Sequence, residues 1–142
     1  MSSRAFATVQ KSFVDEAERI FGFLASEFGL AGPERQGIVL PVVAFIGPGV
    51  RYRIMLEPDD KVAFTQVEVD EEGGTLVAEL DQLVLAASLG TRQQVRTSAH
   101  TLKSLQKALE SQAGFVRSIH PLMNTDTTIE LMKKADASSV TC

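Results

Sequence analysis

The chain has 142 residues, of which 44% are hydrophobic and 23% are charged, and its net charge is −4. This composition is typical of a folded globular protein, and the length suits a single domain over residues 1–142 with one core. The mild acidity gives no long-range attraction for nucleic acid or for an anionic membrane surface, so we expect neither as a partner.

The cysteine and the apolar runs indicate the cellular setting. Cys142 is the only cysteine, which excludes an intrachain disulfide and fits a reducing, cytoplasmic location. The N-terminus has no apolar block of the kind that marks a signal peptide. The longest apolar run, residues 38–50, contains Pro41 and Gly47 and falls short of the ~20 residues that a spanning helix needs.

The first predicted element is a long helix over about residues 3–28. Its apolar residues recur at spacings of three and four, which places them on one side of a helix. Gly29 and Gly32-Pro33 follow and predict the stop. The apolar stripe consists of Phe6, Val9, Phe13, Ala17, Ile20, Phe21, Leu24 and Phe28.

Strand patterns follow the helix. Residues 38–46 are β-branched and apolar on both sides, which predicts a strand covered on both faces. Residues 50–57 alternate between apolar and polar side chains, as in a strand with one face in the core. Pro58-Asp59-Asp60 predicts a turn after this strand.

Two further strands are predicted over residues 61–70 and 75–79. The first alternates through Val62 and Phe64 and then changes phase to Val67 and Val69, which predicts a β-bulge near Thr65-Gln66. A hairpin turn at residues 71–74 joins the two strands.

The C-terminal part is predicted to be helical. A short helix covers residues 80–89, and a longer one carries Leu102, Leu105 and Leu109 on one stripe, with Thr97 or Ser98 as its cap. This stripe fits the core or a helix-mediated dimer. Residues 128–134 add a short amphipathic helix, and we expect residues 135–142 to form a flexible tail.

Together these elements predict an α+β fold. It comprises a long N-terminal helix, a mainly antiparallel sheet of three to four strands, and C-terminal helices packed on one face of the sheet. The phenylalanines of the first helix are expected to anchor it to the core. The positions that we expect to meet them are Tyr52, Ile54, Val62, Phe64 and Leu105.

Arg51 and Arg53 are the strongest candidates for recognition. They alternate with core residues, so both guanidinium groups project from the same side of a strand and could clamp a carboxylate or a phosphate. The alternative is cross-strand pairing with Glu68 or Asp70, which would make them part of a solvated sheet surface.

The acidic turns are the second candidate region. Asp59, Asp60, Glu71 and Glu72 offer carboxylates to a partner. The acidic cluster Glu68, Asp70, Glu71 and Glu72 does not match the order of a calcium loop. The two histidines lack zinc-ligand spacing, and no strained nucleophile motif surrounds any serine. We therefore expect no catalytic residue, no metal and no cofactor.

Several segments resemble small uncharacterised bacterial proteins of the kind encoded beside polymorphic toxins as immunity proteins. The resemblance is carried by Phe21-Gly22-Phe23-Leu24, Glu27-Phe28-Gly29-Leu30, Val50-Arg51-Tyr52, the leucines at 102, 105 and 109, and His120-Pro121-Leu122-Met123. It implies a non-enzymatic protein whose partner is a toxin, and it implies no catalytic residue.

Two function classes follow. The first is a non-enzymatic protein-binding domain, of the immunity type, that uses the polar sheet surface and the acidic turns. The alternative is a domain, or a small enzyme built on it, that binds a small molecule or an anion through Arg51 and Arg53. We also expect a homodimer, with the apolar segment 38–46 or the Leu102 stripe at its interface.

Overall fold

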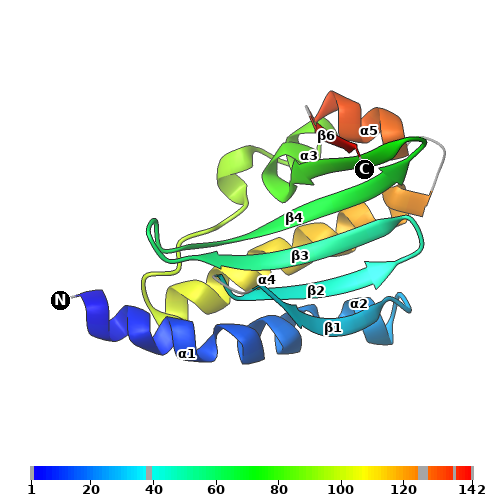
Figure 1. Ribbon diagram of the computed structural model, residues 1–142. Coiled ribbons are helices and arrows are strands. Elements are labelled where there is room, and N and C mark those ends of the chain that lie inside the picture. Colours follow the sequence, from blue (N-terminus) through cyan, green and yellow to red (C-terminus); the bar gives the residue numbers. More distant parts are fainter. Residues whose placement is uncertain (1, 38–39, 125–127, 136, 142) are drawn as a thin grey trace.

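The computed structural model describes residues 2–37, 40–124, 128–135 and 137–141. Helices lie toward both ends of the chain, with most strands between them (Figure 1). In chain order the elements are α1 (Ser2–Phe21), α2 (Phe23–Ser26), β1 (Ala31–Gln36), β2 (Val42–Gly47), β3 (Val50–Glu57), β4 (Val62–Glu71), β5 (Gly74–Glu79), α3 (Leu80–Ala86), η1 (Arg92–Gln94), α4 (Leu102–Ile119), η2 (His120–Asn124), α5 (Thr128–Lys134) and β6 (Ser138–Thr141).

The strands form one sheet in the order β1-β2-β3-β4-β5-β6, and every neighbouring pair is antiparallel. Figure 1 shows α4 behind the sheet and α1 along its lower margin, where α1 packs against α4 and β2. The helices α3 and α5 pack against β4 and β5. The α+β architecture with C-terminal helices on one face is confirmed. The predicted strand number is wrong, because the sheet has six strands rather than three to four.

The additional strands are β1 and β6, which lie at the two edges. The single helix predicted over residues 3–28 is divided at Gly22 into α1 and α2, which ends at Ser26, and Gly29 follows with a φ of 75°. The polar segment after it then pairs with β2, and a Cβ at Gly32 would lie 2.7 Å from the carbonyl oxygen of Ala44. This close approach requires a glycine. At the other edge, where we expected a flexible tail, Ser138–Thr141 pairs with β5.

The predicted bulge in β4 is wrong. The strand alternates without interruption, and Ala63, Thr65 and Val67 all face the core. Val62 and Phe64 therefore lie on the opposite side and are half-buried. Thr65 can face the core because its hydroxyl has a buried polar partner, the side-chain oxygen of Gln112, to which it donates at 2.8 Å. This contact lets a threonine take an inward position.

The beginning of α4 also differs from the prediction. Thr101 caps the helix, since its hydroxyl accepts a hydrogen bond from the Ser104 N–H at 3.1 Å. Thr97 and Ser98 instead run beside β4, where the Ala63 N–H donates to the Thr97 carbonyl at 2.8 Å. This extended segment, residues 95–99, leads from η1 into α4.

The core lies between the helices and the sheet. Phe6, Phe13 and Phe21 of α1 are buried there, as predicted. Phe28 lies beyond α2 and is partly buried. Leu105 and Leu109 of α4 are fully buried in the same cluster, so the expected leucine stripe is part of this core and is not an exposed dimer surface.

Candidate functional site

The side of the sheet opposite the helices, here called the open face, carries the predicted arginines. Core residues Tyr52 and Ile54 point toward the helices, so Arg51 and Arg53 of β3 project to the other side. Arg51 lies directly opposite Glu68 in the β3–β4 register. The structure therefore brings the two arginines together on one surface, as the alternation predicted.

Both arginines form cross-strand ion pairs. Arg51 donates from Nε to Glu68 at 2.9 Å, and from Nη2 and Nη1 to the two oxygens of Asp70 at 2.8 and 3.1 Å. Arg53 donates from Nη1 to the other oxygen of Glu68 at 3.2 Å. Its Nε and Nη2 donate to the side-chain oxygen of Gln36 at 3.2 and 2.9 Å. These five side chains form what we call the charged network.

The electrostatics of this network are internally balanced, because two guanidinium groups face two carboxylates. Hydrogen bonds from Arg51 lower the pKa of Asp70 below its ordinary value. The hydrogen bonds that Arg51 donates to Asp70, and to a smaller extent the one to Glu68, raise the pKa of Arg51. The cross-strand alternative for the arginines is thus what the structure contains.

The four predicted acidic residues do not form one site. Asp59 and Asp60 are exposed in the β3–β4 turn, whereas Glu71 and Glu72 lie at the β4–β5 turn. The ten residues of β4 separate these turns, which corresponds to about 33 Å. Each pair therefore borders the open face at a different end.

An apolar row beside the charged network was missed by the sequence reasoning. Val42, Met55 and Phe64 stand directly opposite one another on β2, β3 and β4, and all three are half-buried. Phe64 was assigned to the core because the bulge was placed after it. Uninterrupted alternation through Thr65 was the signal that would have put it on the open face.

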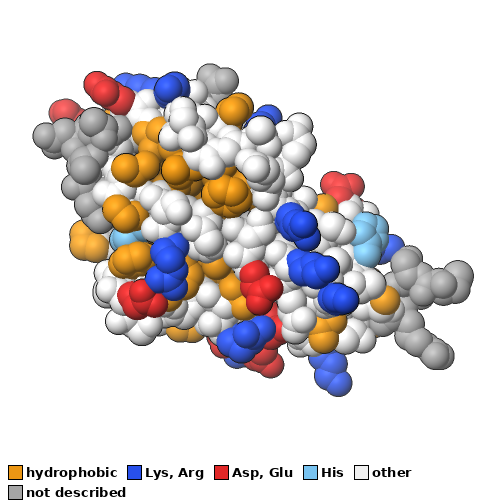
Figure 2. Space-filling model, turned by 180° about the vertical axis from the view of Figure 1, so that it is seen from behind, with side chains coloured by type: hydrophobic (Ala, Val, Ile, Leu, Met, Phe, Trp, Pro, Cys, Tyr) orange, Lys and Arg blue, Asp and Glu red, His pale blue; other side chains and the backbone are white. Residues whose placement is uncertain are grey.

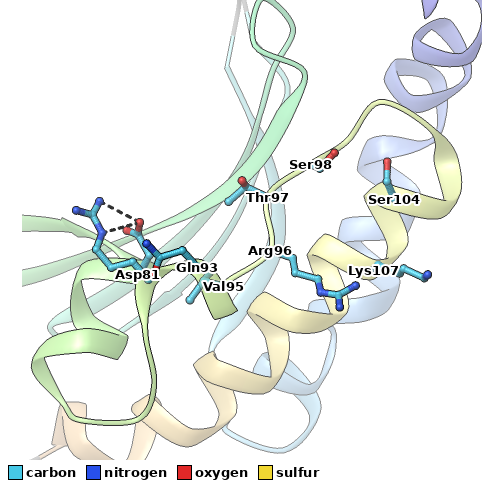
Figure 3. A pocket seen from close by; sticks show the side chains of 9 residues that line it. Asp81, Gln93, Val95, Arg96, Thr97, Ser98, Ser104 and Lys107 are labelled. Carbon is cyan, nitrogen blue, oxygen red and sulfur yellow. Dashed lines mark hydrogen bonds and ion pairs between the residues drawn. The ribbon is translucent and has the colours of Figure 1, made fainter.

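A second region that the sequence reasoning missed is a pocket on the helix side. Figure 3 shows it between the beginning of α3, η1, the segment 95–99 and the first turns of α4. Its charged side chains are Asp81, Arg92, Arg96 and Lys107. One signal was present in the sequence: residues 92–107 contain four Lys or Arg and no carboxylate, in a chain that is acidic overall.

The two histidines have different environments. His100 is exposed just before α4, while His120 is buried against Tyr52 and Phe28. The Nδ1 atom of His120 lies 2.8 Å from the Tyr52 hydroxyl, and burial lowers the pKa of the imidazole. This contact joins η2 to the centre of the sheet and is part of the core.

Neither a metal centre nor a membrane span emerges from the described part of the chain. Within it, no three His, Cys, Asp or Glu side chains are grouped so that they could hold a metal ion. None of the described helices combines the length and the apolar character needed to cross a bilayer. Comparison with known proteins gives no match to a protein-family model, a curated protein or a solved structure.

Proposed function

We propose that this protein is a non-enzymatic binding protein that recognises another protein through the open face of its sheet. The observation that carries the proposal is the arrangement of that face, where the half-buried apolar row adjoins the charged network. Apolar side chains surrounded by polar and charged ones are the usual composition of a protein-binding surface.

The state of the arginines favours a protein partner over a small anion at this surface. Arg51 and Arg53 each direct three donor contacts to Glu68, Asp70 or Gln36. An anion would have to displace these partners and would face two carboxylates. A protein surface can add hydrogen bonds to the remaining donors while it covers the apolar row.

The chemistry of the open face suggests what the partner presents. The row of Val42, Met55 and Phe64 suits an apolar side chain, because these positions lie within contact distance of one another across the strands. The exposed carboxylates of Asp59 and Asp60 at the end of β3 suit a basic group. The resemblance to immunity proteins makes a toxin the first partner to test.

The proposal is tested by quantitative capture from the native host with two matched variants. Met55→Asp places a charge within the apolar row, whereas Leu85→Asp places one on α3, where Leu85 is 54% exposed on the helix side. We expect wild type and Leu85→Asp to retain the same stoichiometric partner. Met55→Asp should weaken that binding by about 2 kcal/mol or more, the scale of an interface hot spot.

Equal binding by a folded Met55→Asp variant would refute the open face as the contact surface. Thermal unfolding of both variants shows whether they are folded. If wild type sediments as a dimer that Met55→Asp converts to a monomer, the occupant of the open face is a second copy of the chain. The proposal of a different partner protein would then be withdrawn.

A further inference from the structure

The pocket on the helix side has the size and lining of a small-molecule site. Its volume is about 550 Å³, within the range of roughly 300–1,000 Å³ that ligand pockets occupy. The hydroxyl groups of Thr97, Ser98 and Ser104 contribute to the lining together with the charged side chains. No residue of the charged network or of the apolar row lines this pocket.

Its cations differ in how they are neutralised. Arg92 is paired with Asp81, at 3.0 Å from Nη2 to Oδ2. Arg96 and Lys107 are exposed and form no ion pair with any residue that the structure describes. Figure 3 shows these two side chains extending on the same side of the pocket, and Figure 2 shows Lys and Arg side chains gathered on this face. Two cations without an ion-pair partner at one pocket favour the binding of an anion there.

The backbone of Arg96 is held by hydrogen bonds to two side chains of α4. Its backbone N–H donates to the Ser111 hydroxyl at 3.2 Å, and its carbonyl accepts from the side-chain nitrogen of Gln112 at 2.7 Å. Gln112 is fully buried and also donates to the Ala63 carbonyl at 2.7 Å. The backbone segment that carries Arg96 is therefore tied to both α4 and β4, so the point from which its side chain extends is set before any ligand arrives.

Asp81 supplies the second recognition feature. Its Oδ2 atom accepts the contact from Arg92, whereas Oδ1 is buried and has no hydrogen-bond partner among the described residues. A buried acceptor without a partner is costly, so a rotation of the carboxylate that offers this oxygen to a donor group on a ligand is favourable. The pocket thus offers cations at one side and a hydrogen-bond acceptor at the other.

We propose that this pocket binds a small phosphorylated molecule that also carries a hydroxyl group, as a sugar phosphate does. The phosphate contacts Arg96 and Lys107, and a hydroxyl donates to the Asp81 carboxylate. A small ligand fits better than a nucleic acid, since the cations are confined to one pocket in a chain of net charge −4.

The test is isothermal titration of the whole chain with ribose 5-phosphate, inorganic phosphate and ribose. Ribose 5-phosphate should bind with one-to-one stoichiometry and more tightly than either other probe. Arg96→Gln and Lys107→Gln should each weaken its binding about tenfold, because each removes one charge-assisted contact. Lys11→Gln, which removes an exposed lysine of α1 outside the pocket, should leave it unchanged.

Asp81→Asn separates the two halves of the proposal. It should weaken ribose 5-phosphate binding without weakening inorganic phosphate, because only the sugar donates to this side chain. Absence of saturable ribose 5-phosphate binding up to on the order of 10 mM, or equal losses in Lys11→Gln and Lys107→Gln, would overturn the proposal. The Met55→Asp variant should bind ribose 5-phosphate like wild type, so failure here is distinguishable from failure at the open face.

Discussion

The open face and the pocket both present arginines, but they use them in opposite ways. On the open face, most guanidinium N–H groups of Arg51 and Arg53 donate hydrogen bonds to neighbouring side chains, which are Glu68, Asp70 and Gln36. In the pocket, only Arg92 is neutralised, and Arg96 and Lys107 have no ion-pair partner among the described residues. The presence of arginines on a surface therefore does not by itself predict that the surface binds an anion. Binding depends on how many of their N–H donors are not already bonded to protein groups.

The largest expected effect comes from the residue that supports the pocket. Gln112→Ala removes two buried hydrogen bonds and one half-buried one, and leaves the Thr65 hydroxyl and two carbonyls with fewer partners. We expect a loss of about 2–4 kcal/mol in the free energy of unfolding, measured by urea titration. Lys103→Ala, at an exposed position of the same helix, is the control and should cost less than about 1 kcal/mol.

A smaller effect is expected from the centre of the charged network. Glu68 bridges both arginines and its side chain is only 14% exposed, so Glu68→Ala should lower the free energy of unfolding by about 1 kcal/mol. Glu71→Ala, at the end of the same strand, removes a carboxylate that forms no ion pair with any described residue. Equal stabilities of the two variants would show that the network contributes nothing.

The smallest effect is a pH dependence of stability that the charged network contributes. Because Arg51 lowers the pKa of Asp70 in the folded state, the stability from this pair is present above the ordinary carboxyl pKa of 3.8. It is lost as the pH falls through the lowered value. Asp70→Asn should therefore lose less stability than wild type between pH 5 and pH 3. Identical losses would argue against the ion pair.

Local patterns predicted the elements whose side chains follow a simple hydrophobic period. The helix stripe of Phe6, Phe13 and Phe21 and the alternation around Tyr52 needed no tertiary information. The phase of β4 was mispredicted because Thr65 faces the core, where only its partner on α4 makes a polar side chain acceptable. The edge strand β1 was missed since its sequence is polar and contains Gly32 and Pro33.

The candidate sites also divide into one that local patterns predicted and one that depends on tertiary contacts. The shared orientation of Arg51 and Arg53, and Glu68 and Asp70 as their cross-strand alternative, followed from alternation along single strands. The pocket required the spatial meeting of α3, η1, residues 95–99 and α4, which no single window of sequence contains. Only the excess of cations between Arg92 and Lys107 was visible beforehand.

The contrast between the two arginine regions is tested most directly by following inorganic phosphate with ¹⁵N-resolved NMR. The account predicts saturable shifts of the Arg96 side-chain N–H and of backbone amides at residues 96–98 and 103–107. The Nε–H signals of Arg51 and Arg53 should stay in place, since both donate to neighbouring side chains. Comparable shifts at Arg51 and Arg53, or none at residues 96–107, would contradict it.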